Sequence, residues 1–398
     1  MWDVIVLTAG NEEQKEIFHR QLDDIPWRIY TRSIQVSVDP PGIRVGSGGA
    51  TIHLLRSNPK FAFQHVLLIH SGGLSQRTPH LSIVGKLFAM LPNGKTLLEL
   101  KLSLYRPLPF VLPSGIFFSA SDVIESLPHN FPQLPSNVDV LLLAHESPLS
   151  VAEQHGVYIV DPDGKLQRVL QKPRREEMEE NGAIREGELT LTDSAFWMSS
   201  MTIVRLSSID LPINCEFCVY GDFLRPLGER KDLSYISSTQ DVKLKEWREM
   251  LSQTLKSSKA QIVNCGPSSF FHFGSLRECL QHFEKESQFF RVVISQAWNI
   301  YVYSKGNFKA PCTSFMEYCS FTEAQIGEHS LLSGCCCENP VIIPNEVFMM
   351  TLPDVCGPFH SSLFSPLEVI HSRKHCDSTR KEVMELWRIV ICFPWKKP

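Results

Sequence analysis

The chain has 398 residues, of which 43% are apolar and 21% charged, as in an ordinary soluble globular protein with room for two domains. Its formal net charge is −4 and it has no long basic block, which argues against nucleic-acid binding as its main function. No apolar run approaches the ~20 residues that span a bilayer, and the 12 cysteines show no zinc-site spacing. The N-terminus does not resemble a signal peptide. We therefore expect a cytoplasmic protein with reduced thiols and no membrane contact; the sequence does not indicate its oligomeric state.

The first part of the chain predicts strands that alternate with helices. Strands are expected at residues 2–8, 34–38, 66–69, 115–120 and 138–144, which are all rich in apolar residues. Helices are expected at residues 11–22, 52–56 and 97–105. This alternation favours a mostly parallel sheet with helices on its faces.

The second part of the chain begins with an expected hairpin. Its strands lie at residues 156–160 and 166–170, because the sequence Asp-Pro-Asp-Gly between them is a strong turn signal. Residues 174–190 are charge-rich and are expected to form a solvated excursion. Further on we expect helices at 241–256 and 275–283 and a strand at 270–273. Beyond about residue 290 short apolar runs alternate with turns, so we place a domain boundary near residues 285–295.

A glycine cluster precedes the helix expected at residues 52–56. It contains Gly46, Gly48 and Gly49, followed by Thr51. Backbone N–H groups at the start of a helix can cradle the phosphate or the base of a nucleotide. Glycine-rich turns are also common as structural features, so the cluster alone is a weak signal, and it lacks the Lys-Ser/Thr ending of a Walker-type ATPase loop.

A second and more specific cluster follows the buried strand expected at residues 66–69. It contains Ser71, Gly72 and Gly73, and then Arg77 and Lys86. Glycines let backbone N–H groups approach an anion with no Cβ in the way. Arg offers a planar fork of donors to phosphate oxygens, and Lys adds a compact positive charge. We expect this stretch to hold a phosphate; a surface loop with chance basic residues is the less favoured alternative.

Other polar residues follow the ends of expected strands. Asp122 comes after the strand at 115–120, at the edge where α/β sheets bind ligands, and it either holds Mg²⁺ or caps a following helix. Asp193 and Asp222 are at later polar breaks, and each could contact sugar, bind metal or cap a helix. Lys172 follows the hairpin and, taken alone, is an ordinary surface lysine.

Together these motifs resemble the fucose-1-phosphate guanylyltransferase family, also called GDP-L-fucose pyrophosphorylases. The resemblance covers roughly residues 2 to 350 and rests on residues 2–9, 45–51, 68–77, 85–92 and 220–224. It is most specific between residues 70 and 92. There the glycines, Arg77, Pro79 and Lys86 follow the order G-G-x-x-x-R-x-x-P…K, which is typical of sugar-nucleotide pyrophosphorylases.

The resemblance implies an α/β protein with a Rossmann-like nucleotidyltransferase core and a C-terminal left-handed β-helix-like domain. The core would occupy residues 1–288 and the β-helix-like domain residues 289–352. Residues 353–398 match nothing in the family and form a tail of uncertain structure. The Cys335–Cys337 run would then lie at or near the packed interior of the β-helix, as inert thiols.

The implied reaction joins GTP and β-L-fucose 1-phosphate to give GDP-L-fucose and pyrophosphate, a step of fucose salvage. The attacking phosphate oxygen is already anionic, so catalysis is positioning and charge neutralisation rather than base chemistry. Arg77 and Lys86 would hold the triphosphate and the departing pyrophosphate as catalytic residues. The implied nucleotide-binding residues are Gly46, Gly48, Gly49, Thr51, Ser71, Gly72 and Gly73.

The resemblance also implies a sugar-phosphate site and a metal site. Gly156, Lys172 and Asp193 would bind the sugar phosphate, and Asp122 and Asp222 would bind Mg²⁺. Bacterial-type pyrophosphorylases carry a second metal carboxylate at a strand end where this chain has His272, a poorer Mg²⁺ ligand. Either Asp222 supplies the second ligand, or the metal relies on Asp122, phosphates and water.

Two alternative functions remain open from the sequence. One is a pyrophosphorylase for another sugar 1-phosphate or another nucleotide. The other is a catalytically weak or inactive regulatory homologue that binds sugar nucleotide. Retention of Arg77, Lys86, Asp122 and Lys172 together argues against the second alternative, and the missing carboxylate at residue 272 argues weakly for it.

Overall fold

The computed structural model describes residues 1–73, 75, 77–128, 130–294, 299–353 and 360–366. Its contacts divide the chain into two compact units. The first unit comprises Met1–Gly73 and Leu98–Phe270, and the second comprises Leu74–Leu97 and the described residues from Phe271 onward. This division differs from the boundary expected near residues 285–295, because residues 74–97 group with the C-terminal part of the chain. Most of the predicted tail at 353–398 lies outside the described residues.

The first unit is built on a mixed sheet with the strand order β10-β6-β9-β4-β3-β1-β2. These strands are β1 (Trp2–Ala9), β2 (Thr31–Val38), β3 (His65–His70), β4 (Gly115–Ala120), β6 (Val140–Pro148), β9 (Leu189–Ser199) and β10 (Ala260–Pro267). Neighbouring strands are parallel except for β9, which is antiparallel to both β4 and β6. The hairpin β7 (Gly156–Val160) and β8 (Leu166–Gln171) joins this sheet through β9, and β5 (Val123–Glu125) follows β4.

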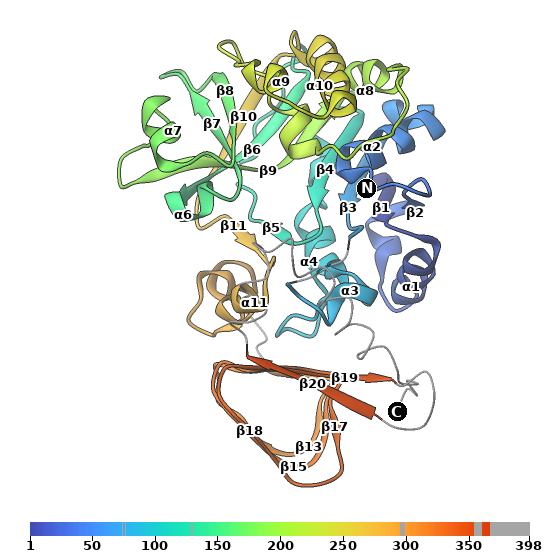
Figure 1. Ribbon diagram of the computed structural model, residues 1–398, viewed down its shortest axis with the longest axis vertical. Coiled ribbons are helices and arrows are strands. Elements are labelled where there is room, and N and C mark those ends of the chain that lie inside the picture. The colour runs from blue at the N-terminus through green and yellow to red at the C-terminus, as the bar shows by residue number, and fades with distance from the viewer. Residues whose placement is uncertain (74, 76, 129, 295–298, 354–359, 367–398) are drawn as a thin grey trace. The chain divides into compact units, whose positions relative to one another are not determined.

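Helices cover the sheet of the first unit. The main helices are α1 (Glu12–Leu22), α2 (Gly46–Ser57), α4 (Leu97–Leu104), α8 (Ser200–Ser207) and α10 (Val242–Leu255). Shorter ones are η1 (Trp27–Ile29), η2 (Pro59–Phe63), α5 (Leu108–Val111), α6 (Leu149–Ala152), α7 (Arg175–Glu180), α9 (Ser234–Ser237) and the π-helical turn η4 (Val219–Phe223). Figure 1 shows α2, α8 and α10 grouped together, and their apolar side chains form one core with residues of the central strands.

The strand register brings the carboxyl ends of three neighbouring strands to one edge of the sheet. Leu7 of β1 pairs with Ile69 of β3, and His70 at the end of β3 pairs with Ala120 at the end of β4. Below that edge the ring of His70 stacks on Phe118, and Phe118 stacks on Phe196 of β9. The loops that follow these strands are therefore held on a packed aromatic support.

The second unit contains stacked parallel strands. It includes α3 (Leu81–Val84), η3 (Lys86–Phe88), α11 (Leu276–Phe283) and η5 (Phe290–Ile294), and β11 (Phe270–His272) spans the division. The later strands are β12 (Tyr301–Val302), β13 (Lys305–Lys309), β14 (Phe315–Glu317), β15 (Ser320–Ile326), β16 (Leu331–Ser333), β17 (Cys336–Cys337), β18 (Val341–Ile343), β19 (Val347–Pro353) and β20 (His360–Pro366).

Two parallel ladders run through the described strands of this second unit. One ladder joins β12, β14, β16 and β19, and the other joins β13, β15 and then β17 and β18, whereas β20 pairs antiparallel with β19. Cys335 is buried in the core between the coils, as predicted, whereas Cys336 is exposed, so the prediction of an interior position fails for that residue. The left-handed β-helix implied by the resemblance stays a prediction.

Most of the predicted elements are present, and their caps explain where they begin. The side chains of Asn11, Asp241 and Ser275 accept hydrogen bonds from the first turns of α1, α10 and α11, as N-caps do. Two predictions are wrong in detail. The helix expected at 52–56 already begins at Gly46, and the excursion expected at 174–190 contains the short helix α7.

Candidate functional site

The loop after β3 is held against β1 by its own donors. The N–H groups of Ser71 and Gly72 both donate to Thr8 Oγ1, at 3.0 Å and 3.2 Å, and Ser71 Oγ donates to the Thr8 carbonyl at 2.7 Å. A Cβ on Gly72 would lie 3.2 Å from the nitrogen of Gly10, so glycine allows the close approach of the two loops. Gly73 follows with a φ of +130°, which favours glycine. The nucleotide role predicted for Ser71, Gly72 and Gly73 remains a prediction.

The first glycine cluster forms the opening turns of α2 and packs against a distant segment. Gly48 donates its N–H to the Phe217 carbonyl at 2.9 Å, and Gly49 donates to the Val45 carbonyl at 3.2 Å. A Cβ on Gly48 would lie 2.3 Å from the Phe217 ring, and one on Gly46 would lie 2.4 Å from the Phe217 carbonyl oxygen. These contacts give the glycines a packing role, and the donors of Gly48 and Gly49 are already used within the protein.

Asp222 forms an ion pair with Arg248 inside the first unit. Its Oδ1 accepts from Arg248 Nε at 2.8 Å, and its Oδ2 accepts from the backbone N–H of Cys218, also at 2.8 Å. Both carboxylate oxygens therefore have a donor, and the side chain is only 5% exposed. A cation bound here would have to displace Arg248, so this geometry does not favour Asp222 as a magnesium ligand.

Asp193 combines with the hairpin to form a second acidic position. Its Oδ1 accepts from the N–H of Gly156 at 2.8 Å, and a Cβ on Gly156 would lie 2.3 Å from Oδ2, which is why glycine occurs there. Oδ2 is buried without a hydrogen-bond partner in the described part of the chain. Burial raises the pKa of Asp193 to about 7, opposed by the Gly156 N–H and by the charge of Lys172. The sequence predicts that three residues act together, and the structure places them as neighbours: Gly156, Asp193 and Lys172.

Lys172 itself has an unusual backbone. It follows β8 with a φ of +49°, and its N–H donates to the His155 carbonyl at 3.0 Å. A positive φ is uncommon outside glycine and costs on the order of 1 kcal/mol or more unless the surroundings hold it. The side chain is exposed, so its ammonium group is accessible to an anion.

Asp122 lies in the turn between β4 and β5, at the carboxyl edge of the sheet, and is partly exposed. A strand rather than a helix follows it, so the alternative that Asp122 caps a helix is wrong. Among the residues that the structure describes, no cluster of three His, Cys, Asp or Glu side chains is placed to hold a metal ion. Mg²⁺ is commonly held by one or two carboxylates together with phosphates and water, so the carboxylate of Asp122 fits a metal that arrives with a nucleotide.

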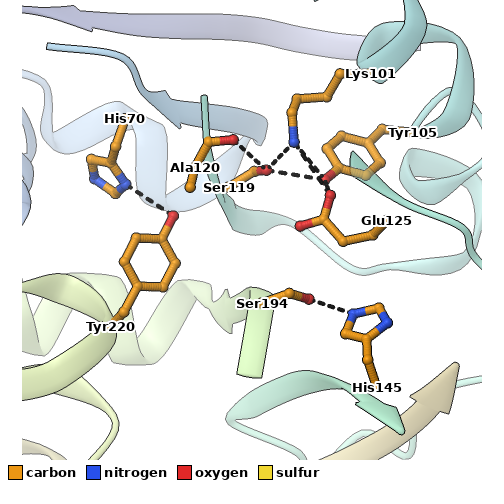
Figure 2. A network of polar contacts seen from close by, with 9 residues as sticks. All are labelled: His70, Lys101, Tyr105, Ser119, Ala120, Glu125, His145, Ser194 and Tyr220. Carbon is orange, nitrogen blue, oxygen red and sulfur yellow. Dashed lines mark hydrogen bonds and ion pairs between the residues drawn. The ribbon is translucent and has the colours of Figure 1, made fainter. Parts of the chain in front are cut away.

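A fully buried charged network lies beside the end of β4, and the sequence did not reveal it. Lys101 Nζ donates to Ser119 Oγ at 2.7 Å and to Glu125 Oε2 at 3.3 Å, and the hydroxyl of Tyr105 also donates to Glu125 Oε2 (Figure 2). Lys101 and Glu125 are 0% and 1% exposed. Burial lowers the pKa of Lys101, opposed by the charge of Glu125. Glu125 Oε1 has no hydrogen-bond partner within the described ranges.

Two buried histidines accompany this network in Figure 2, and the sequence did not single out either as a functional residue. His70 contacts Thr51 Oγ1 at 2.9 Å and the hydroxyl of Tyr220 at 3.4 Å. His145 contacts Ser194 Oγ at 2.6 Å and Ser269 Oγ at 2.7 Å. Burial lowers the pKa of each histidine to about 3, so both rings are neutral. The available signal was their position directly after an apolar run.

The second unit holds the two predicted catalytic residues. Lys86 opens η3 after Gly85, which has a φ of +86°. A Cβ on Gly274 would lie 2.8 Å from Arg77 Nη2 and 2.6 Å from His272 Nε2, so both side chains crowd this glycine.

His272 is held by a carboxylate rather than standing alone. Its Nδ1 lies 2.9 Å from Glu278 Oε1, and Ser275 Oγ donates to Glu278 Oε2 at 2.7 Å. Burial alone would raise the pKa of Glu278, but the bond and charge of His272, the Ser275 bond and the charge of Arg77 lower it to about 2. His272 therefore belongs to a cluster with Arg77 and Glu278, whereas its role as a second metal ligand stays untested.

Comparison with known proteins identifies the family of the chain. A family model described as the fucose pyrophosphorylase domain matches residues 59–355. The chain belongs to the fucose pyrophosphorylase family. The match includes the loop after β3, Asp122, Lys172, Asp193 and the stacked coils, and it begins after the glycine cluster of α2.

Curated relatives agree with this family. The chain is 32% identical to fucose-1-phosphate guanylyltransferase of Mus musculus in an alignment of 337 residues, which covers 72% of this chain and 57% of that protein. It is 30% identical to fucose-1-phosphate guanylyltransferase of Homo sapiens in an alignment of 338 residues, which covers 72% of this chain and 56% of that protein. This fucose pyrophosphorylase family member thus spans little more than half the length of these relatives. A crystal structure described as mannose-1-phosphate geranyltransferase from Thermus thermophilus covers 97% of this chain and 99% of its own, at 11% identity, but its TM-score of 0.36 is too low to carry an argument.

Within the described residues no helix has both the length and the apolar character needed to cross a bilayer.

Proposed function

We propose that the chain transfers a guanylyl group from GTP to β-L-fucose 1-phosphate, giving GDP-L-fucose and pyrophosphate in fucose salvage. The observation that carries this proposal is the family match over residues 59–355, which includes every predicted sugar-phosphate residue and both predicted catalytic residues. The sugar, the nucleotide and a cytoplasmic location are part of the proposal. So is the interpretation of the stacked coils as a left-handed β-helix attached to a nucleotidyltransferase core.

The sugar phosphate is proposed to bind beside β9 and the hairpin. Lys172 presents an exposed ammonium group that can neutralise the phosphate, and its charge acts on Asp193. Asp193 is fixed through Gly156 and, among the described residues, retains a buried oxygen without a partner. A cation for the phosphate and an acceptor for a hydroxyl are thus adjacent, as a sugar phosphate requires.

The nucleotide is proposed to bind through Arg77 and Lys86, with Ser71, Gly72 and Gly73 lining its loop. In the reaction a phosphate oxygen of the sugar forms a bond to the α-phosphorus of GTP. The bond from that phosphorus to the bridging oxygen of the β-phosphate breaks, and its electron pair leaves with pyrophosphate. Arg77 and Lys86 would stabilise the negative charge that develops on the leaving group. No proton has to be removed, so no general base is assigned.

Mg²⁺ is the proposed cofactor, and Asp122 is the residue that would hold it. When bound, the ion would neutralise charge on the nucleotide phosphates. Asp122 supplies an oxygen ligand at the carboxyl edge of the sheet, while Asp222 is occupied by Arg248.

The proposal is tested by measuring pyrophosphate release from the purified chain with each nucleoside triphosphate and a panel of sugar 1-phosphates, with and without Mg²⁺. We expect release with GTP and L-fucose 1-phosphate in the presence of Mg²⁺. Arg77→Ala should lower kcat/KM by about a hundredfold or more, as loss of a transition-state donor does. Arg20→Ala, which changes an exposed arginine on α1, is the matched control and should leave the rate unchanged.

Two results would contradict the proposal. Release only with a different sugar phosphate or nucleotide would assign the site to that substrate. No release with any pair, combined with retained binding of a sugar nucleotide, would make the chain a binding protein.

A further inference from the structure

Each of the two buried histidines in the first unit carries a chain of hydrogen bonds whose direction can be assigned. The first chain begins at the Ser47 carbonyl, which can only accept and receives the hydroxyl hydrogen of Thr51 at 2.8 Å. Thr51 Oγ1 must then accept from His70, so the proton of this neutral ring is on Nε2. His70 Nδ1 carries no proton and accepts from the hydroxyl of Tyr220.

The hydrogen-bond directions in the second chain, around His145, are assigned in the same way. Ser269 Oγ donates to the Gly266 carbonyl at 2.6 Å, so it accepts from Nδ1 of His145. Because His145 is neutral, its Nε2 is an acceptor and receives the hydroxyl hydrogen of Ser194 at 2.6 Å. The two histidines thus carry opposite tautomers, and each fixes the direction in which a neighbouring hydroxyl donates.

Both hydroxyls are left with only lone pairs to offer. Tyr220 Oη and Ser194 Oγ each donate their single hydrogen to a histidine, so toward any further group they can only accept. A third acceptor lies nearby, since the charge of Glu125 raises the pKa of Tyr220, after burial as the larger cause. Glu125 Oε1 is buried without a hydrogen-bond partner among the described residues, while Lys101 and Tyr105 hold the other oxygen.

The three oxygens belong to elements that meet at the end of β4. The ring of Tyr220 lies edge-on to Phe196 of β9, with centroids 5.8 Å apart, and Ser194 lies two residues before Phe196. Figure 2 shows one carboxylate oxygen of Glu125 turned toward the side on which Tyr220 lies, while the hydroxyls of Tyr220 and Ser194 point to His70 and His145. We call Tyr220 Oη, Ser194 Oγ and Glu125 Oε1 the acceptor set.

The acceptor set favours ligands that can donate hydrogen bonds over ligands that can only accept them. A phosphate at neutral pH has almost only acceptors and would be repelled by these lone pairs, whereas a carbon-bound hydroxyl has a hydrogen to donate. Lys172, the group suited to phosphate, is instead exposed at the end of β8. We propose that the acceptor set receives hydrogen bonds from the free hydroxyls of the sugar phosphate, and that Tyr220, Ser194 and Glu125 determine sugar specificity. In this role His70, His145 and Lys101 are positioning residues. The inference rests on the proposed function for the identity of the sugar.

The first test uses sugar analogues and distinguishes donors from acceptors. Deoxyfluoro analogues of L-fucose 1-phosphate keep an electronegative atom at C2, C3 or C4 but lose the hydroxyl hydrogen. At the contacted positions we expect each deoxyfluoro analogue to raise KM by about tenfold, as much as the deoxy analogue, because one hydrogen bond contributes about a factor of 3–10. Deoxyfluoro analogues that behave like the parent sugar at all three positions would overturn the proposal, because the protein would then be supplying donors to the sugar.

The second test crosses protein variants with the same analogues. Tyr220→Phe and Ser194→Ala should each raise KM for L-fucose 1-phosphate by about three- to tenfold and leave KM for GTP unchanged. Each penalty should vanish with the one deoxy analogue that lacks the matching hydroxyl, since the hydrogen bond is already absent there. Tyr301→Phe and Ser200→Ala remove hydroxyls that bond to backbone carbonyls elsewhere, and they are the matched controls.

Three outcomes separate the two proposals. A wild-type chain that makes no GDP-fucose contradicts the proposed function itself. An active wild type whose variants show unchanged KM for the sugar overturns the acceptor set while leaving the function intact. A rise in KM for GTP instead would mean that the guanine donors occupy the set, which also overturns the inference.

The third test concerns the histidines directly. Nitrogen-15 NMR of the imidazole side chains reports which ring nitrogen carries the proton, and it does not depend on activity. We expect His70 with the proton on Nε2 and His145 with the proton on Nδ1, both neutral at about pH 6, well above their lowered pKa values. The opposite tautomer at either ring would free the neighbouring hydroxyl to donate and would remove that hydroxyl from the acceptor set.

Discussion

The glycine cluster of α2 and the acceptor set are two polar regions of the same unit, and they differ in how their hydrogen-bonding groups are used. In the glycine cluster the N–H groups of Gly48 and Gly49 are bonded to backbone carbonyls, and the missing side chains make room for Phe217. In the acceptor set Ser194 and Glu125 are also buried, yet Glu125 Oε1 has no partner in the described part of the chain. A buried polar group without a partner costs free energy, so its persistence is better evidence for a ligand than a glycine-rich motif is.

Lys101→Met tests the support of the acceptor set and has the largest expected effect. Removing one partner of a buried ion pair leaves an unpaired charge on Glu125, which costs about 3–5 kcal/mol of unfolding free energy. Chemical denaturation of the purified variant measures the loss. The double variant Lys101→Met, Glu125→Gln should recover part of it, because the uncompensated charge is gone.

Lys165→Met is the matched control for that experiment. Lys165 pairs with Glu229 on the surface, where both side chains are more than half exposed, so we expect little change in stability. Equal losses of unfolding free energy in the two lysine variants would show that the buried ion pair contributes no more to stability than the surface pair.

Asp193→Asn tests whether a second buried carboxylate makes the unfolding free energy depend on pH. Burial raises the pKa of Asp193 to about 7 in the folded protein, so the folded state holds this proton more tightly than the unfolded state. The carboxylate therefore stabilises the fold least above pH 7, and the unfolding free energy falls as pH rises from about 4 to about 7. Relative to wild type, the asparagine variant should gain on the order of 4 kcal/mol across that range, from about 1.4 kcal/mol per pKa unit.

Thermal unfolding of both proteins at about pH 4.5, 6 and 8 measures this difference. The first two pH values lie in the range where the unfolding free energy of the wild type is expected to fall, and the third lies above that range. A constant difference between wild type and variant at all three pH values would show that Asp193 titrates normally. The variant should in parallel lose affinity for the sugar phosphate, because the amide nitrogen replaces an acceptor with a donor.

Gly48→Ala tests the other side of the comparison and has a smaller expected effect. The new Cβ would meet the Phe217 ring at 2.3 Å and its carbonyl oxygen at 2.9 Å, so we expect a loss of about 1–3 kcal/mol of unfolding free energy from overpacking. Gly10→Ala is the control, because its Cβ would have only ordinary contacts at 3.6 Å and 3.8 Å. A stable Gly48→Ala variant with weakened GTP binding would instead show that Gly48 contributes to nucleotide binding, as predicted from the sequence.

The sequence was sufficient to predict structural features that depend only on residues close together in the chain. The apolar run of β3, the helix starts at Asn11 and Ser275, and the turn between β7 and β8 were all predicted, because their signals are local. The family was likewise evident from the order of residues between Gly72 and Lys86, and the match at residues 59–355 confirms it.

Features that depend on distant residues were missed for a physical reason. β9 was not predicted as one long strand because Thr190, Thr192, Asp193 and Ser194 interrupt its apolar character, although all four are buried in the fold. The close approach of Gly48 to Phe217 and the pairing of Lys101 with Glu125 each join residues far apart in sequence, where spacing carries no signal. The division at residues 73/74 and 97/98 was missed for the same reason.

The most direct test of the account is a crystal structure of the chain with L-fucose 1-phosphate. We predict that the sugar hydroxyls lie within hydrogen-bond distance of Tyr220 Oη, Ser194 Oγ or Glu125 Oε1, with the phosphate at Lys172. A phosphate bound at these three oxygens, or sugar hydroxyls bound instead by the glycines of α2, would contradict it.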